Sequence, residues 1–269
     1  EKLLMGHIAV PRVLHWFKWE AFSTWISGMV LMALIYYTGG GTFLLDDSVS
    51  QISFYQGLAI SIGSVFGSWF LYDALWETKI VSEGLVGHVL TIILLIVLAY
   101  FLSQTLSGRA AYIHMAAIMG TWMVGNVLMR ILPRQTKMVE ATSNGEVVNP
   151  DWGINAKNRS THNTYLTLPV IVIMISNHFP ETYGHDLNWL LLLIICLGGA
   201  FVRQFFIIRE SNYLKAKLFL IPALVTLALA FKMTLEINQQ ETVIIKKETT
   251  VKLNDKSKVN TAIDNNSLV

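Results

Sequence analysis

The chain has little charge and almost no cysteine. Charged residues make up 14% of its 269 residues, where an average soluble domain carries about 25%. The single cysteine, Cys196, excludes an internal disulfide, and the lack of a CxxCH motif excludes a covalently attached c-type haem. The net charge of +2 is too small to indicate nucleic-acid binding. Residues 1–20 are charged and rich in tryptophan, unlike a secretory signal peptide.

Long apolar runs are abundant instead, and hydrophobic residues reach 53%. A hydrocarbon core about 30 Å thick is crossed by roughly 20 apolar helical residues. The runs that fit are Phe22–Thr38, Tyr55–Leu75, Leu85–Leu106, Ala110–Leu132, Thr164–Ser176, Trp189–Ile208 and Leu218–Leu235. They predict an all-α fold, a polytopic transmembrane bundle of about seven helices spanning residues 1–235.

The last segment, residues 236–269, has a different composition. It is rich in Lys, Thr, Asn and Asp, and it contains no aromatic residue. We therefore expect a polar, disordered tail.

The distribution of Lys and Arg predicts the orientation of the bundle. Basic residues gather before the first run and after the second, fourth and sixth, whereas Arg109 is the only one in the opposite breaks. By the positive-inside rule, the amino-terminal segment and a Pro133–Asn163 loop are cytoplasmic, and the tail is exported.

Polar residues fall into two predicted layers. Near the cytoplasmic face lie His15, His88, His162, Lys18, Glu20 and Arg159; near the exported face lie His114, Asn177 and His178. An ionisable group at membrane depth is a functional hypothesis by default. Two such layers suit a redox protein that takes electrons on one side and delivers them on the other.

The histidines of the exported layer suggest a cofactor hypothesis. His114 and His178 come from antiparallel helices at similar depth, so they are candidate axial ligands of a haem. The alternative is that both only hydrogen-bond to neighbouring helices. We identify no metal-ligand set.

We expect several other polar and small residues to have structural roles. We expect Arg130 and Arg203 to extend to the cytoplasmic interface and Asn126 to bond to a neighbouring helix. Gly63 and Gly67 form a small-residue notch suited to close helix packing.

Three stretches are unusual enough to indicate a family. They are LHWFKWEAFSTWISG at 14–28, SGRAAYIHMAAIMGTWMVGN at 107–126 with PRQTKMV at 133–139, and RSTHNTYLTLPVIVIMISNHFPETYG at 159–184. Together they resemble the membrane domain of the cytochrome-c-linked, membrane-bound urate oxidases of bacteria. The likeness runs from about Val13 to about Arg209.

The resemblance implies an eight-helix domain in the bacterial inner membrane that oxidises urate to 5-hydroxyisourate. Electrons would pass to a c-type cytochrome fused at the exported carboxyl end. The chain departs from this pattern twice, because it lacks the family's first helix and the terminal cytochrome. A separate c-type cytochrome is therefore the expected electron acceptor.

Urate is a planar anion at neutral pH, and a guanidinium, amides and a proton acceptor would recognise it. Arg159, His162 and Asn163 supply such a set, and His15, Lys18 and Glu20 complete it across the same interface.

Two alternatives to this function remain open. One is an electron-transfer or assembly subunit without the reaction; the other is a small-anion transporter, which the lack of an internal repeat disfavours.

Overall fold

The protein is a bundle of helices. The computed structural model describes residues 2–78 and 85–235, and of residues 2–15 it describes the backbone alone. In chain order the elements are α1 (Lys2–Met32), η1 (Ala33–Tyr37), η2 (Gly39–Gly41), α2 (Phe54–Glu77), α4 (Leu85–Ser103), α5 (Gly108–Gly125), η3 (Asn126–Ile131), α6 (Leu132–Ser143), α7 (Pro150–Ser176), α8 (Pro180–Tyr183), α9 (Asn188–Ile208) and α10 (Tyr213–Lys217). A last helix follows at 220–235. The tail at 236–269 lies outside the described residues.

Six helices of the described chain are long and apolar enough to cross a membrane. They are Trp16–Tyr37, Phe54–Glu77, Leu85–Ser103, Gly108–Ser143, Asn188–Ile208 and Tyr213–Leu235. Each overlaps most of a run that the sequence predicts as a span. The remaining predicted span, Thr164–Ser176, is the apolar second half of α7, whose first half is polar. The helices are compatible with a membrane protein.

The predicted loop at Pro133–Asn163 is wrong, because almost all of it is helical. α5 continues through the π-helical turn η3 into α6, so one helix runs over the 36 residues Gly108–Ser143. Pro133 does not end it, since proline lies in the first turn of α6, next to the widened turn. The connection to α7 is limited to residues 144–149. α6 and the start of α7 pack together, with the Met138 side chain against Gly153.

Local sequence signals fix where several helices begin. Ser53 and Gln56 form a capping box at the start of α2, in which each side chain bonds to the other residue's backbone N–H. Ser107 caps α5 by accepting from Ala110 N–H, and Asn149 caps α7 by accepting from Asp151 N–H. These caps satisfy backbone donors that have no partner inside the helix.

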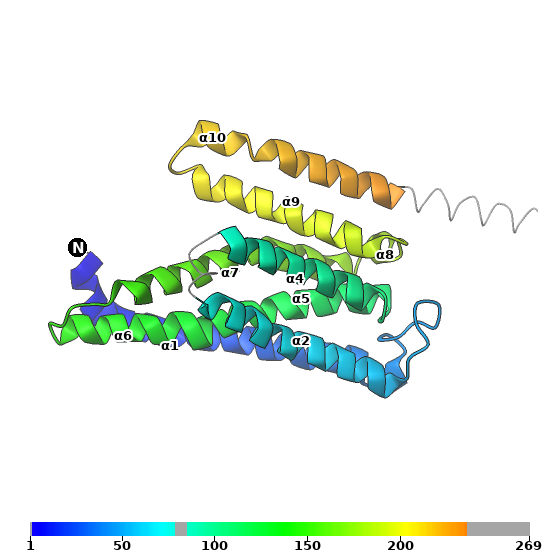
Figure 1. Cartoon of the computed structure of the whole chain (residues 1–269), viewed down its shortest axis with the longest axis horizontal. Coiled ribbons are helices and arrows are strands. Elements are labelled where there is room, and N and C mark those ends of the chain that lie inside the picture. Colours follow the sequence, from blue (N-terminus) through cyan, green and yellow to red (C-terminus); the bar gives the residue numbers. More distant parts are fainter. Residues whose placement is uncertain (1, 79–84, 236–269) are drawn as a thin grey trace, which may run out of the picture.

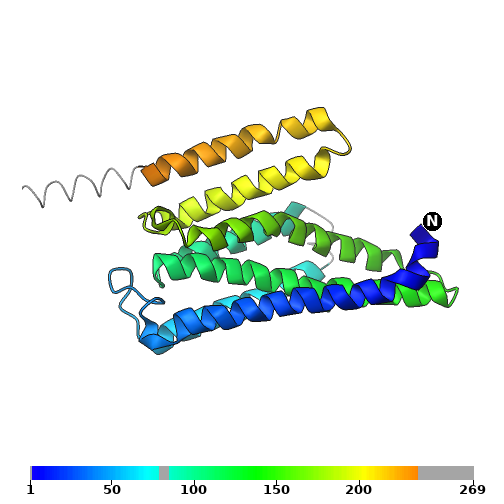
Figure 2. The same cartoon turned by 180° about the vertical axis from the view of Figure 1, so that it is seen from behind.

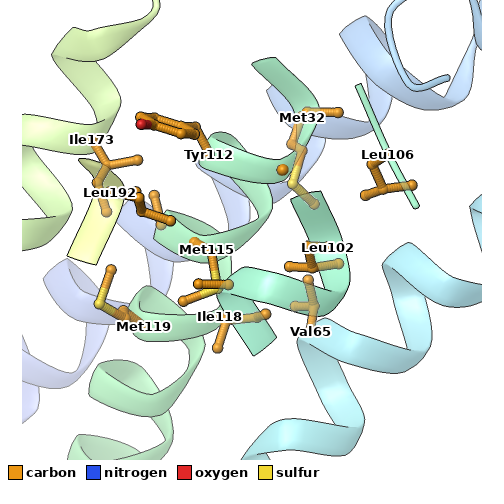
Figure 3. Packing of buried hydrophobic residues seen from close by; sticks show 14 of the residues in the cluster. Met32, Val65, Leu102, Leu106, Tyr112, Met115, Ile118, Met119, Ile173 and Leu192 are labelled. Carbon is orange, nitrogen blue, oxygen red and sulfur yellow. The ribbon is translucent and has the colours of Figure 1, made fainter. Parts of the chain in front are cut away.

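α5 is the central helix of the bundle. Its buried face carries Tyr112, Met115, Ile118, Met119 and Trp122. Around it lie buried residues of α1, α2, α4, α7 and α9, namely Met32, Val65, Leu102, Ile173 and Leu192 (Figure 3). α5 therefore packs against most of the other helices and holds them together around one core.

The other helices form layers around α5. α1 lies along one side of the bundle (Figure 1), and α9 with Tyr213–Leu235 lies along the opposite side (Figure 2). α7 lies between α5 and α9 and packs closely against both. Gly199 allows this approach, because a Cβ there would lie 3.1 Å from Cδ of Pro169 in α7.

The predicted notch at Gly63 and Gly67 is wrong within the described chain. A Cβ added at either glycine would meet nothing within 4 Å. The close approach between α2 and α5 lies instead at Gly125, where a Cβ would be 2.7 Å from the ring of Trp69. Spacing of small residues does not show which face of a helix meets its neighbour.

Candidate functional site

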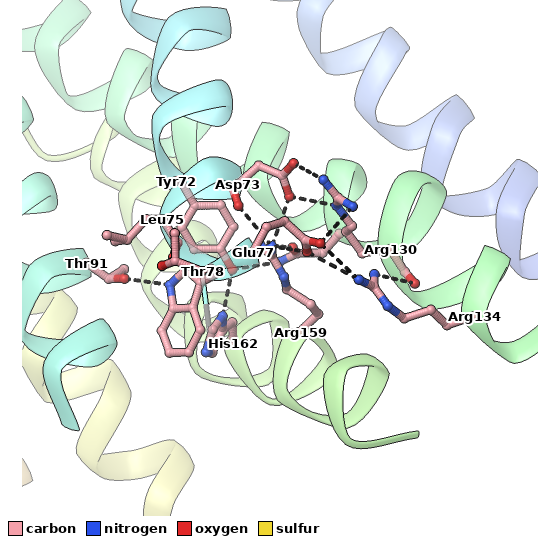
Figure 4. Close-up of polar contacts among 12 residues, drawn as sticks. Tyr72, Asp73, Leu75, Glu77, Thr78, Thr91, Arg130, Arg134, Arg159 and His162 are labelled. Atoms are coloured by element: carbon pink, nitrogen blue, oxygen red, sulfur yellow. Dashed lines mark hydrogen bonds and ion pairs between the residues drawn. The ribbon is translucent and has the colours of Figure 1, made fainter. Parts of the chain in front are cut away.

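A network of ion pairs joins the end of α2 to two other helices. Asp73 and Glu77 lie in the last turns of α2, and Arg130 and Arg134 lie on the helix that runs from η3 into α6. Arg130 Nε donates to Oδ1 of Asp73 at 2.8 Å, and its Nη2 contacts Oδ2. Arg130 Nη1 is 3.2 Å from Glu77 Oε2, and Arg134 Nη2 is 3.2 Å from the same oxygen. Figure 4 shows both arginines converging on the two carboxylates.

Arg159 of α7 completes this network from within. Its side chain is 1% exposed, and its Nη2 is 2.9 Å from Oδ1 of Asp73 and 3.0 Å from Oε1 of Glu77. Nη1 donates to Oδ1 of Asn126 at 3.3 Å. The guanidinium also lies over the ring of Tyr72, 5.1 Å from the centroid. The positive charge of Arg159 is therefore balanced by carboxylates of the same chain. Its contacts link α7 to α2 and η3.

The sequence reasoning missed the carboxylates, although a signal for them was present. Asp73 and Glu77 are four residues apart, as are Arg130 and Arg134, so each pair occupies one helix face. Carboxylates at the end of an apolar run need a partner at membrane depth. Arg130 is paired with Asp73 and Glu77 and its side chain is 26% exposed; its expected position at the membrane interface stays a prediction.

A chain of neutral hydrogen bonds continues from this network. Nδ2 of Asn126 donates to the Tyr72 hydroxyl at 3.0 Å and to Oδ1 of Asn163 at 2.8 Å, which confirms that Asn126 bonds to neighbouring helices. The Tyr72 hydroxyl is 2.6 Å from Nδ1 of His162. The hydroxyl accepts from Asn126 with one lone pair, so it can either donate to Nδ1 or accept from Nδ1–H, according to the tautomer of His162.

Aromatic rings enclose His162. Its ring centroid lies 4.1 Å from that of Trp76 and 5.8 Å from that of His88. On the other side, Tyr72 stacks on Trp122 with a centroid distance of 4.5 Å and an angle of 8° between the planes. Trp76 is itself held in place, because its Nε1 donates to Thr91 Oγ1 at 2.8 Å. His162 and Tyr72 are thus fixed in a tight aromatic setting.

A cavity of about 1010 Å³ lies between α1, α5 and α7. Most of its wall is apolar and comes from α1 and α5, with Trp25, Met29, Ala117 and Val124 as examples. The polar residues of the wall are Glu20 and Thr24 of α1, Tyr36 of η1, Gln135 of α6, Ser160, Asn163, Thr164 and Thr167 of α7, Asn177 just after α7, and Arg203 of α9. The cavity is therefore a mainly apolar chamber with a polar stripe along α7.

The residues predicted to bind urate do not all lie together: some line the cavity, and others belong to the ion-pair network or the hydrogen bonds next to it. Glu20 and Asn163 line the cavity, whereas Arg159 and His162 point into the network on another face of α7. Asn163 joins the two places through Asn126. Lys18 is exposed, and the side chain of His15 lies outside the described part of the chain. Roles for these six residues in catalysis stay predictions.

The histidines predicted as haem ligands lie near the opposite end of the bundle. Arg109 Nε of α5 donates to Asn177 Oδ1 after α7 at 3.3 Å, so the two helix ends meet there. Buried His114 donates from Nδ1 to Ala110 O at 2.7 Å, because a carbonyl only accepts. Nε2 then accepts from the Tyr37 hydroxyl at 3.0 Å.

An axial histidine needs a ring nitrogen free for iron. Both nitrogens of His114 are engaged by the protein, and His178 is exposed. As they lie here, the two side chains do not fit a haem. Shared ligation stays a prediction, and it requires His114 to give up the bond to Tyr37.

Comparison with known proteins identifies the family. No curated protein and no solved structure matches the chain. The family model described as "Urate oxidase N-terminal" matches residues 1–234. That match covers the helical bundle and includes both the ion-pair network and the cavity. The chain therefore belongs to the urate oxidase N-terminal family.

Proposed function

We propose that the chain is the membrane domain of an enzyme that oxidises urate. In this reaction urate and water give 5-hydroxyisourate, two protons and two electrons, and a separate c-type cytochrome accepts the electrons in two one-electron steps. The observation that carries the proposal is the family match over residues 1–234. Six helices with the length and apolarity of membrane spans support a site inside the bilayer.

The polar wall of the cavity suits the edges of urate. An amide offers two N–H donors and two oxygen lone pairs. Asn163 uses one donor toward Met123 O at 2.9 Å and one lone pair toward Asn126. One N–H and one lone pair therefore remain, which match the alternating carbonyl and N–H groups of the purine. The proposed role of Asn163 is to orient urate.

His162 and Arg159 act behind Asn163 in this proposal. The chain from His162 through Tyr72 and Asn126 fixes the direction in which the Asn163 amide points. Arg159 holds Asn126 and the two carboxylates, so it positions the chain and does not clamp the substrate. This revises the predicted role of Arg159 as the urate-binding fork.

The test uses the purified full chain in lipid nanodiscs with urate and a soluble c-type cytochrome. We expect loss of urate with reduction of two cytochromes per urate. Asn163→Leu should remove at least nine-tenths of the rate, about the tenfold or greater loss expected when a buried hydrogen-bond pair is broken. The matched control, Asn144→Ala, changes an exposed asparagine at the end of α6 and should leave the rate unchanged.

Two results would change the proposal. If an artificial acceptor such as ferricyanide supports urate loss and the cytochrome does not, urate oxidation stands and the acceptor is wrong. Folded protein that consumes no urate with either acceptor would favour the alternative of a non-catalytic electron-transfer or assembly subunit.

A further inference from the structure

We propose that Arg203 anchors an anionic purine in the cavity between α1, α5 and α7, and that hydroxyl groups of α7 accept hydrogen bonds from the N–H groups of the purine. The inference rests on the proposed function, because it names the place where urate binds. It also changes the expected role of Arg203, which the sequence alone places at the membrane interface.

The first observation concerns the guanidinium itself. Arg203 lies on α9 and lines the cavity. Its Nε is buried and has no hydrogen-bond partner within the described part of the chain. Buried polar groups are almost always hydrogen-bonded, so an unpaired guanidinium nitrogen needs an explanation. Nε is covered by protein atoms, so an anion in the cavity would pair with it after a shift of the Arg203 side chain; a guanidinium recognises a planar anion through paired N–H groups.

Helix packing explains how Arg203 reaches the cavity. α9 packs closely on α7 around Gly199, one helical turn before Arg203. The next residue, Gln204, accepts a hydrogen bond from the Tyr165 hydroxyl of α7. Arg203 is thereby held beside α7 and lines a cavity that otherwise belongs to α1, α5, α6 and α7.

The charge of the cavity favours an anion near Arg203. Glu20 and Arg203 are the ionisable acidic and basic residues of its wall. Glu20 is exposed and lies on α1, and no ion pair between the two occurs among the described residues. Arg159, in contrast, already has two carboxylate partners. Arg203 is thus the guanidinium of the cavity wall to which an incoming anion would bind.

The hydroxyl groups of α7 supply acceptors for the other edge of the purine. Thr164 Oγ1 donates to Ser160 O at 3.0 Å, and Thr167 Oγ1 donates to Asn163 O at 2.7 Å. Each hydroxyl has then used its proton and retains lone pairs. Together with Asn163, these hydroxyl groups present acceptors to the ring N–H groups, while Arg203 faces the anion.

The size and lining of the cavity fit this ligand. Its volume of about 1010 Å³ is at the upper end of ordinary small-molecule sites, which measure about 300–1,000 Å³. It therefore has room for a purine together with the water that the oxidation consumes. The faces of the flat ring would lie against Trp25 and Val124, which belong to the apolar wall.

The experiment measures equilibrium binding of urate and of hypoxanthine, a neutral purine at pH 7, to the chain in nanodiscs. Arg203→Gln should weaken urate binding about tenfold or more, as expected for loss of a hydrogen bond to a charged group. Hypoxanthine binding should change much less. Arg209→Gln is the matched control, because Arg209 follows Ile208 at the end of the same helix and is exposed.

Further variants keep the test decisive if Arg203→Gln does not fold. Arg203→Lys retains the charge without the guanidinium fork and should lose part of the affinity. Thr167→Val preserves shape and removes one acceptor, so it should weaken both purines alike. Wild-type urate affinity in Arg203→Lys and Arg203→Gln would overturn the site.

The outcomes separate this inference from the proposed function. Urate oxidation by the wild type with unchanged affinity in Arg203→Gln would remove the site and keep the function. Urate binding that depends on Arg203 without any oxidation would keep the site and remove the function. A wild type that binds no urate overturns the binding site.

Discussion

Arg159 is a buried cation whose partners come from two other elements. Its guanidinium is 1% exposed and lies within 3.0 Å of both Asp73 and Glu77. Arg159→Ala should lower the free energy of unfolding by about 1–3 kcal/mol, because it removes the buried guanidinium that bonds to Asn126 and to both carboxylates. Thermal unfolding in detergent micelles measures this change.

A neighbouring arginine provides the comparison. Arg134 is 17% exposed and pairs with Glu77 alone among the carboxylates, at 3.2 Å. Arg134→Ala should cost about 0–1 kcal/mol, since a half-exposed pair is weak. Equal losses in the two variants would mean that burial of Arg159 does not decide the stability of the network.

The sequence showed part of this site and concealed the rest. Arg159, His162 and Asn163 were recognisable because polar residues cluster where an apolar run begins. Their directions were not recognisable, since adjacent residues such as His162 and Asn163 are about 100° apart around a helix. The partners Asp73 and Glu77 lie more than 80 residues away in the chain, and only the packing of α2 on α5 and α7 brings them together.

At the scale of elements, the contact between α2 and α5 depends on one glycine. A Cβ at Gly125 would lie 2.7 Å from the Trp69 ring, which is buried and packs against the ring of Tyr72. Gly125→Ala should therefore destabilise the protein by about 1–3 kcal/mol through overpacking. Thermal unfolding of the purified variant measures the loss.

Gly120 on the same helix is the matched control. A Cβ there would meet nothing within 4 Å, so Gly120→Ala should be neutral or stabilising by up to about 1 kcal/mol, owing to the better helix propensity of alanine. A stable Gly125→Ala variant would show that α2 can move away from α5 without loss.

Helices in this chain were predictable to the extent that they are apolar. Runs such as Leu85–Leu106 correspond closely to α4, because uninterrupted apolar residues indicate a span directly. α6 and the first half of α7 were predicted as a loop, since their composition is polar and they bury few residues. Their helicity comes from the continuation of α5 through η3 and from the Asn149 cap, which apolar runs do not reveal.

For the whole molecule, the predicted membrane topology depends on α7. Helix α7 has 27 residues and is about 40 Å long, enough to cross a bilayer, although its first half is polar. If α7 crosses, topology reporters fused at Gly145 and Asn254 should lie on opposite sides. Cytoplasmic fluorescence of a green fluorescent protein fusion and exported activity of an alkaline phosphatase fusion measure this.

Gly145 suits such a fusion, because it lies in the short connection between α6 and α7 with φ +71° and nothing within 4 Å of a Cβ. A third reporter at exposed Asp47, between η2 and α2, should lie opposite Gly145. Reporters at Gly145 and Asn254 on the same side would mean that α7 does not cross, and that six spans form the membrane domain.

The ion-pair network also has an electrostatic consequence beyond its own stability. Three guanidinium groups, of Arg130, Arg134 and Arg159, meet two carboxylates there, which leaves one positive charge in excess. Low-dielectric surroundings screen such a charge poorly. Its field would draw anions toward this end of the bundle and repel cations, so salt should slow the arrival of an anionic ligand more than that of a neutral one.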